Sequence, residues 1–461
     1  MAPDPKDQSP AQSSTDGSAE DPSAGETRMT LTQAMELATA LHHGGRMAEA
    51  VAIYQQILDV SPDHPDAFHH LGLCRFEQGD ADQGIALVRR AIELAPEFAD
   101  AHNNLGNMLR IRGSLDEAAA AYQRAIALRP DNADAINNLA TTLKARGRLE
   151  EAVAMFERAL VLAPDHVPTL NNLGNVLVRM GKQGRALDHF HKALLLAPYD
   201  GRTYYRLGHA LCMENRLKDA ADIYRRWMAL EPDKPEPRHL LAACTGESVP
   251  ERASKEFVER LFDRFAPTFD AVLDTLEYKA PALVAEAVRD ALPPAAAGAL
   301  DILDAGCGTG LAGPLLRPYA RRLVGLDLSR HMLGLAQARG CYDELVQADL
   351  TEHLTSHEGV YDLIAMVDTL CYFGDLREVV RGCARALRTG GHLVFTVEMS
   401  EPGVAPGGYH LHPHGRYSHT EAYLRSRLGD AGLVPRQLRV AELRIEYTPV
   451  QGLLVMANRV A

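Results

Sequence analysis

The chain has 461 residues, of which 46% are hydrophobic and 24% charged, so its length allows two or three globular domains with cores of their own. The formal net charge of -13 disfavours a partner held through phosphates, and we expect neither nucleic acid nor an anionic membrane surface. Seven cysteines without a C-x-x-C pair predict reduced thiols and no zinc site. The sequence shows no apolar run long enough to span a membrane and no signal peptide, which predicts a cytoplasmic location.

The N-terminal segment from Met1 to Arg28 is rich in Pro, Ser, Asp, Glu and Gly and contains no apolar core. Such a segment cannot bury enough apolar surface to offset the entropy that ordering would cost. We therefore predict a disordered tail over residues 1–28.

A 34-residue period fills the next part of the chain. Prolines show it most clearly, at Pro62, Pro96, Pro130, Pro164, Pro198 and Pro232. Small residues recur at Ala50, Gly84, Ala118, Ala152, Ala186 and Ala220, and an aromatic residue follows four positions later in most units. Small residues let antiparallel helices approach closely, and proline ends a helix. The pattern resembles the tetratricopeptide repeat, which implies six helix pairs over 29–233, a capping helix over 236–244 and an all-α solenoid domain over 29–247.

A polar column precedes the repeat leucines and contains Asn104, Asn138 and Asn172. In this repeat family, notably in O-linked N-acetylglucosamine transferases, asparagines at this position line the concave groove and hold peptide backbone. An amide donates and accepts at once, which suits a peptide bond. The resemblance implies a groove for a protein or peptide partner; the alternative is that NNLG is only the usual spelling of these repeats.

The period ends near Glu247, and residues 248–254 form a predicted linker to a second domain over 248–461. Phenylalanines at helix-like spacing predict helices within 255–292. Strands alternating with helical segments then predict an α/β fold with a mostly parallel sheet covered on both faces. The predicted strands are 301–305, 322–327, 344–348, 361–367 and 392–398, with Gly390–Gly391 as the turn before the last, and 433–447 with 450–458 as an antiparallel edge.

The first of these strands runs into a glycine loop, Asp304-Ala-Gly-Cys-Gly-Thr-Gly310. Glycines at a strand-to-helix turn let the backbone approach a ligand and leave N–H groups pointing at it. A dinucleotide is one candidate ligand, but its fingerprint needs a third glycine where Leu311 stands, which disfavours a nicotinamide oxidoreductase. The spelling D-x-G-x-G-x-G instead resembles motif I of the class I S-adenosylmethionine-dependent methyltransferases.

Acidic residues at the ends of the second and third strands agree with this resemblance, which implies S-adenosylmethionine as cofactor and a Rossmann-like fold with a mostly parallel seven-stranded sheet and an antiparallel edge. It implies that Asp304 orients the methionine ammonium, that Asp327 holds the ribose hydroxyls and that Asp349 contacts the adenine amine. Each could alternatively be an ordinary turn or strand cap. The implied cofactor-binding residues are Asp304, Gly306, Cys307, Gly308, Thr309, Gly310, Asp327, Leu328, Met332, Asp349, Leu350 and Val367.

The methyl acceptor is expected beside the carboxyl ends of the fourth and fifth strands. The fourth is followed by residues 368–372, and the fifth by a predicted loop over 409–419 that is rich in histidine. We expect this loop to be a lid that faces the substrate, with Tyr417 or His419 as candidate base; a solvated loop is the alternative. His410, His412 and His414 alternate, but Pro413 and Gly415 disturb the strand that a metal site would need, so no metal is predicted.

The sequence therefore predicts a methyltransferase that acts on an unidentified acceptor, with N-terminal repeats that mediate protein–protein interaction. The phrase from Leu387 to Glu398, followed by Gly-Arg-Tyr-Ser-His419, resembles bacterial tetratricopeptide-repeat proteins fused to such a methyltransferase. The repeats would either recruit a protein substrate or assemble a complex. The alternative from another class is an interaction scaffold whose domain binds cofactor but no longer transfers methyl. The complete motif set favours the enzyme.

Overall fold

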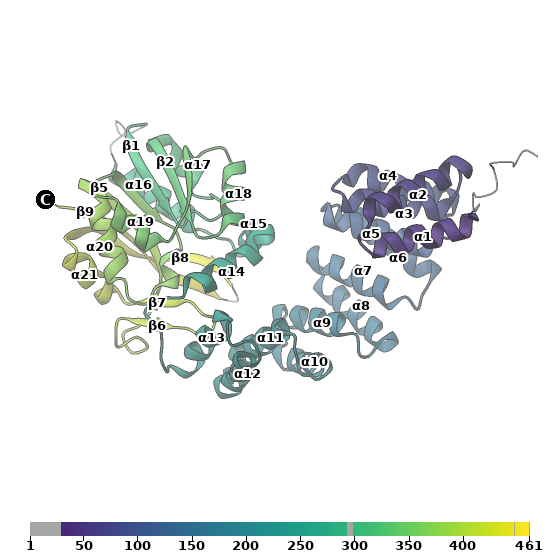
Figure 1. Ribbon diagram of the computed structural model, residues 1–461. Helices are drawn as coiled ribbons and strands as arrows, with labels where there is room; N and C mark the ends of the chain where they lie inside the picture. Colours follow the sequence, from purple (N-terminus) through teal and green to yellow (C-terminus); the bar gives the residue numbers. More distant parts are fainter. Residues whose placement is uncertain (1–28, 293–297, 447, 461) are drawn as a thin grey trace, which may run out of the picture. The chain divides into compact units, whose positions relative to one another are not determined.

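The structure is a computed structural model, and it describes residues 29–292, 298–446 and 448–460 (Figure 1). The predicted tail over 1–28 lies outside these residues. Judged by compactness, the chain forms two units that divide between Pro164 and Asp165. The second unit thus contains the last repeats together with the α/β fold, and the domain boundary expected at 247/248 stays a prediction.

The described part of the first unit consists of antiparallel helix pairs, in which small residues face large ones. A Cβ atom on Gly106 would lie 2.6 Å from the ring of Tyr122, so only glycine lets these two helices approach so closely. The pairs are α1 (Leu31–His43) with α2 (Met47–Val60), α3 (Pro65–Glu77) with α4 (Ala81–Leu94), α5 (Ala99–Ile111) with α6 (Leu115–Leu128), and α7 (Ala133–Ala145) with α8 (Leu149–Leu162).

The second unit begins with two more pairs of the same kind, where Gly174 packs against Phe190 and Gly208 against Tyr224. They are α9 (Val167–Arg179) with α10 (Gln183–Leu196), and α11 (Gly201–Met213) with α12 (Leu217–Leu230). The helix α13 (Pro235–Thr245) follows and ends at Gly246 in the left-handed conformation. The predicted six pairs and the capping helix are confirmed.

An α/β fold occupies the rest of the second unit. Helices α14 (Lys255–Phe265), α15 (Phe269–Thr275) and α16 (Ala280–Ala291) precede the sheet. The strands are β1 (Leu300–Ala305), β2 (Ala320–Asp327), β3 (Glu344–Gln347), β4 (Tyr361–Met366), β5 (Leu387–Met399), β6 (Tyr409–Leu411), β7 (Tyr417–His419), β8 (Leu433–Ile445) and β9 (Pro449–Arg459). The helices between them are α17 (Gly313–Leu316), α18 (Arg330–Ala338), α19 (Leu350–Ser356), α20 (Arg377–Ala386) and α21 (Glu421–Asp430).

The sheet confirms the mostly parallel arrangement with an antiparallel edge. Its order is β3-β2-β1-β4-β5, and β9 pairs antiparallel with both β5 and β8. Two details differ from the prediction. The loop predicted over 409–419 forms the hairpin β6–β7, which pairs with the end of β5 and extends the expected seven strands to nine among the described residues. Gly390 lies in a bulge within β5, because the register to β4 shifts there, so Gly390–Gly391 does not precede the strand.

Side chains alternate between the two faces of the sheet and enter two separate cores, as a parallel strand covered on both sides requires. Ile302 and Leu363 pack against α16, whereas Leu303 and Ile364 face the side of α19 and α20. The carboxyl ends of β1, β2 and β4 thereby meet at one edge, where the glycine loop begins.

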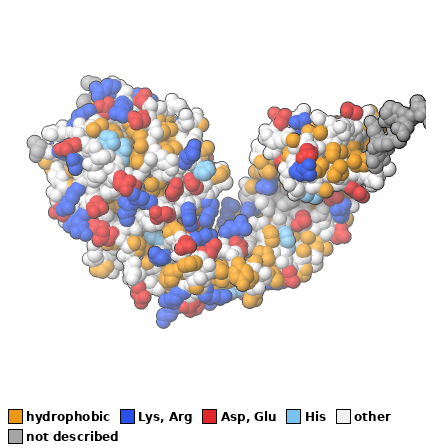
Figure 2. Space-filling view, viewed as in Figure 1, with side chains coloured by type: hydrophobic (Ala, Val, Ile, Leu, Met, Phe, Trp, Pro, Cys, Tyr) orange, Lys and Arg blue, Asp and Glu red, His pale blue; other side chains and the backbone are white. Residues whose placement is uncertain are grey.

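Figure 2 shows basic and acidic side chains interspersed over the visible face of this fold. Among the described residues, none of the helices combines the length and apolar character that a membrane crossing needs.

Candidate active site

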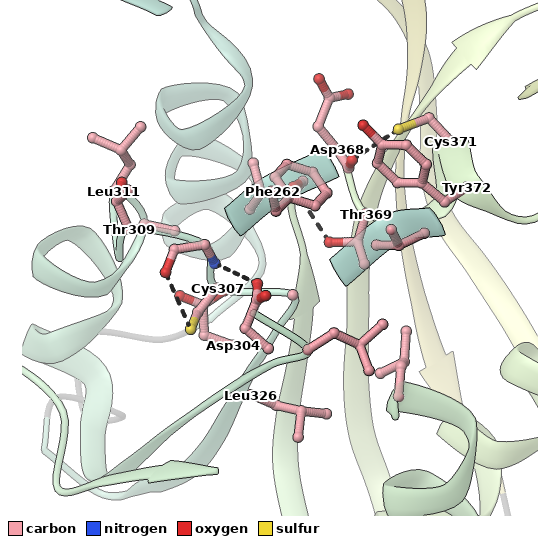
Figure 3. A pocket seen from close by; sticks show the side chains of 18 of the residues that line it. Phe262, Asp304, Cys307, Thr309, Leu311, Leu326, Asp368, Thr369, Cys371 and Tyr372 are labelled. Carbon is pink, nitrogen blue, oxygen red and sulfur yellow. Dashed lines mark hydrogen bonds between the residues drawn. The ribbon is translucent and has the colours of Figure 1, made fainter. Parts of the chain in front are cut away.

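A cavity of about 170 Å³ opens at this edge of the sheet (Figure 3). The glycine loop forms its floor, the ends of β2, β3 and β4 form one side, and α14 and α15 cover it with the side chains of Phe262 and Phe269. Most of the predicted cofactor-binding residues line this cavity. Those that do are Asp304, Gly306, Cys307, Gly308, Thr309, Asp327, Leu328, Asp349, Leu350 and Val367.

Two of the predicted cofactor-binding residues do not line the cavity. Gly310 turns its backbone toward Tyr342, whose ring would lie 2.9 Å from an added Cβ atom. Met332 is fully buried in α18, where it belongs to the core. Both residues therefore support the loop from behind.

Asp304 is almost fully buried beneath the glycine loop. Tyr342 donates its hydroxyl to Oδ2 at 2.7 Å, while Oδ1 has no hydrogen-bond partner among the described residues. Burial raises the pKa of Asp304 to about 6, although the Tyr342 hydroxyl lowers it. A buried carboxylate oxygen without a hydrogen-bond partner destabilises the protein. The site therefore favours a ligand with a cationic group that donates a hydrogen bond to Oδ1. The role of Tyr342 escaped the sequence analysis, because no motif marks it.

Asp327 closes the glycine loop from the end of β2. The backbone N–H of Gly308 donates to Asp327 Oδ2 at 2.9 Å, and the N–H of Ser329 donates to Oδ1 at 2.9 Å. Burial raises the pKa of Asp327, and these two backbone donors lower it. The loop is also tied to α15, because the Thr309 hydroxyl donates to Asp270 at 2.5 Å. The Asp327 carboxylate thus holds the glycine loop in place and also lines the cavity.

Asp349 caps α19 and is paired with a residue from the linker. Its Oδ1 accepts the backbone N–H groups of Thr351 and Glu352, and its Oδ2 accepts Arg252 Nη2 at 2.6 Å. Burial raises the pKa of Asp349, but Arg252 outweighs this effect and lowers it. Arg252 also lies over the ring of Phe373, 5.3 Å from its centroid. Arg252 could not be predicted from the sequence, since the linker carries no motif.

The two candidate bases, Tyr417 and His419, do not line the cavity. Both are fully buried in β7. Tyr417 donates its hydroxyl to the Pro250 carbonyl at 2.7 Å, and His419 Nε2 lies 3.0 Å from the Gly374 carbonyl. Burial lowers the pKa of His419 to about 4. The geometry gives these residues a structural role and does not support either as the base, because a hairpin replaces the lid that the sequence predicted.

The hairpin instead joins the capping helix to the α/β fold. Leu411 and Tyr417 pack against Ala242 and Ala243 of α13. The His239 ring nitrogen Nε2 lies 2.9 Å from the Gly415 carbonyl. Two other hairpin histidines have hydrogen-bond partners of their own: His412 Nε2 lies 2.7 Å from the Ser418 hydroxyl, and His414 Nδ1 accepts the Arg416 N–H at 3.4 Å. Among the described residues, no group of three or more His, Cys, Asp or Glu side chains is placed to hold a metal ion.

A cluster of buried charges forms the end of the cavity beyond β4. Arg444 of β8 is only 1% exposed and donates to three carboxylates: Asp368 at 3.0 Å, Glu446 at 2.9 Å, and Glu398. Arg416, beside the hairpin, pairs with Glu398 at 3.1 Å and with Glu446. Asp368, Arg416 and Arg444 all line the cavity. The sequence offered no signal for Arg444, because β8 also carries Arg436, Arg439 and Glu442 and nothing marks one of these charged residues as buried.

The asparagine column of the repeats makes hydrogen bonds between successive repeats. Asn138 donates Nδ2 to Asn103 Oδ1 at 3.3 Å, and Asn104 Nδ2 lies 3.0 Å from His69 Nε2. Asn172 is likewise only half-buried. These bonds give the column a structural use, and its role in a peptide groove stays a prediction.

Comparisons with known proteins agree with both parts of the chain. Residues 303–395 match a family model described as a methyltransferase domain, and residues 70–133, 131–198 and 177–244 match tetratricopeptide-repeat models. Human methyltransferase-like protein 27 is 41% identical over 138 residues, which is 30% of this chain and 54% of that protein. The ubiquinone biosynthesis O-methyltransferase of Cronobacter sakazakii is 31% identical over 99 residues, 21% of this chain and 41% of that protein.

The chain thus spans about half the length, or less, of these curated relatives. Among solved structures, PilW, a type IV pilus biogenesis factor, is similar at 20% identity and a TM-score of 0.43, over 46% of this chain and 98% of that one. The family matches lie in both the repeats and the α/β fold. The chain is therefore a tetratricopeptide-repeat protein that carries a methyltransferase domain.

Proposed function

We propose that the chain is an S-adenosylmethionine-dependent methyltransferase, and that its repeats hold a protein partner. The use of S-adenosylmethionine is supported mainly by Asp304. Its Oδ1 is buried at the cavity without a hydrogen-bond partner among the described residues. The ammonium group of a methionine moiety would supply the missing donor and the opposite charge. The sulfonium of the bound donor supplies a methyl group that is already activated for transfer.

The remaining residues fit the other parts of this donor. Asp327 would accept the ribose hydroxyls, as acids at the end of the second strand do in related dinucleotide folds. Asp349, oriented by Arg252, would accept the adenine amine. Phe262 and Phe269 would cover the donor and exclude water from it, which strengthens every charge interaction in the cavity.

The affinity for S-adenosylhomocysteine is expected to rise with pH through about 6. Asp304 has a folded pKa of about 6, so its carboxylate is mostly protonated below this pH and cannot pair with the ammonium. Asp304→Asn should weaken binding by about 10- to 100-fold at pH 8 and remove the pH dependence, as the loss of a charged hydrogen bond implies.

Isothermal calorimetry between pH 5 and 8 measures both effects. Asp343→Asn is the matched control, because Asp343 pairs with Arg317 at 2.6 Å and does not line the cavity. It should leave the affinity unchanged. If Asp304→Asn bound as tightly as the wild-type chain, the proposed donor site would be wrong.

The asparagine column supports the proposal of a protein partner. Two variants distinguish partner binding by this column from its hydrogen bonds between repeats. Asn138→Ala removes the column amide together with its hydrogen bond to Asn103, whereas Asn103→Ala removes the same hydrogen bond and leaves the column amide in place. With methyl-labelled S-adenosylmethionine and lysate of a strain lacking the chain, Asn138→Ala should lower the label in the protein fraction by about 3- to 10-fold relative to Asn103→Ala. Equal labelling by the two variants would contradict a groove that recruits the substrate.

A further inference from the structure

The backbone of Asp368 is held in a conformation that side chains other than glycine rarely adopt. Its φ is +56°, in the left-handed region, directly beyond the end of β4. The N–H of Asp368 donates to Thr396 Oγ1 at 2.9 Å, and the Cys371 thiol donates to its carbonyl at 3.0 Å. Such strain persists only where the surroundings impose it, and it is common at functional sites. These two hydrogen bonds fix the backbone of Asp368, so its side chain stands at a defined point of the cavity wall.

The carboxylate of Asp368 is only partly satisfied. Oδ2 accepts Arg444 Nη1 at 3.0 Å, and Oδ1 has no hydrogen-bond partner among the described residues. The side chain lines the cavity and keeps 16% of its surface exposed, while Oδ1 itself is buried. Burial raises the pKa of Asp368, while the positive charge of Arg444 lowers it. Figure 3 shows Asp368 grouped with Cys371 and Tyr372, away from Asp304 and Cys307 of the donor end.

The net charge of the buried cluster indicates which charges the bound donor and acceptor should carry. The three carboxylates of Asp368, Glu398 and Glu446 face the two guanidinium groups of Arg416 and Arg444, which leaves one negative charge. One sulfonium would balance this charge in a site of low dielectric. An acceptor that carried a further positive charge would disturb the balance, whereas an uncharged acceptor would keep it.

We propose that Asp368 is the proton acceptor of the transfer, and that the group methylated is uncharged and carries a proton on its reacting atom, as a hydroxyl does. This inference rests on the proposed function. In the step, the acceptor oxygen forms its bond to the methyl carbon while the carbon–sulfur bond breaks and its electron pair stays on sulfur. The proton of the hydroxyl moves to Asp368, which later releases it to water. Arg444 holds the carboxylate in place throughout.

The position and charge of Asp368 can be tested without knowing the acceptor. Sinefungin is an analogue of S-adenosylmethionine in which a carbon that carries an amine replaces the methylated sulfonium. Its protonated amine would occupy the place of the transferred methyl group and pair with Asp368. Calorimetry at pH 7.5 should show that the full chain binds sinefungin at least about tenfold more tightly than S-adenosylhomocysteine, because the pair is charged.

Asp368→Asn should abolish this preference and leave the affinity for S-adenosylhomocysteine within about twofold. Asparagine tolerates the left-handed backbone. Should the amide disturb folding, Asp368→Gly removes the carboxylate and suits the positive φ, and it should lose the preference equally. Asp343→Asn should keep it. An unchanged preference in both Asp368 variants would overturn the inference. A wild-type chain that failed to bind S-adenosylhomocysteine would instead contradict the proposed function.

Discussion

Replacing Arg444 with Met is expected to lower the free energy of unfolding by about 3–5 kcal/mol. The guanidinium group is 1% exposed and faces Asp368, Glu398 and Glu446. Met fills a similar volume but leaves three partly buried carboxylates without their main counter-charge. Because Arg416 contacts only two of these carboxylates, it can compensate only in part.

Urea unfolding followed by circular dichroism measures this loss, and Arg436→Met is the matched control. Arg436 is exposed on the same strand, and surface charges contribute little to stability, so the control should change the unfolding free energy by less than about 0.5 kcal/mol. If the two variants had similar free energies of unfolding, the buried charge cluster would not stabilise the fold as its geometry predicts.

The difference in the free energy of unfolding between the wild-type chain and Arg444→Met should become smaller at acidic pH. Burial raises the pKa of Glu446, but the charges of Arg416 and Arg444 outweigh it and bring the pKa to about 2. A depressed pKa contributes stability that is present above the unfolded value of about 4.3 and is lost as the pH falls toward 2. The variant keeps only the part of this contribution that Arg416 supplies, so the wild-type chain loses more stability than the variant between pH 4 and pH 2.

Substituting Gly306 with Ala is expected to weaken the binding of S-adenosylhomocysteine by about 10- to 100-fold. Gly306 has a φ of +79°, and an added Cβ atom would overlap the side chain of Thr369, which donates to the Ala305 carbonyl at 2.9 Å. The strain of such a residue is about 1–3 kcal/mol, and relief requires the glycine loop to move. The N–H groups of Gly306 and Cys307, which donate to the Leu326 carbonyl, would then shift, and the cavity floor would move with them.

Gly334→Ala provides the comparison for Gly306→Ala. Gly334 lies in α18, where an added Cβ atom would meet nothing within 4 Å, so alanine should stabilise the helix slightly and leave the affinity unchanged. Calorimetry and thermal unfolding together separate loss of binding from loss of fold. Wild-type affinity in Gly306→Ala would mean that the loop does not approach the donor closely.

Contacts within the second unit show that the end of the repeats is more than a tether. Arg252 of the linker orients Asp349 and lines the cavity, and the hairpin β6–β7 packs on α13. The same hairpin carries Arg416, which reaches the charged cluster at the end of the cavity beyond β4. The capping helix and linker therefore take part in building both ends of the cavity.

The amino-acid sequence by itself determined the parts of this protein that arise from local or periodic patterns. The 34-residue period predicted the helix pairs, because a small residue recurs at one position of every unit and a proline closes the unit. The alternation of strands and helices predicted the sheet, and the glycine loop with Asp304 and Asp327 predicted the cavity floor. These features are readable because their partners lie a few residues apart or follow a fixed order along the chain.

Only the tertiary structure decided which distant charges meet. Arg252 and Asp349 are 97 residues apart, and Arg444 and Asp368 are 76 apart, with no period or motif to connect them. The hairpin was missed for a related reason: its strands are three residues long, and they are stabilised by α13 and by the end of β5 and not by their own propensity. Burial and charge pairing depend on how elements pack in space, and a single sequence does not display that packing.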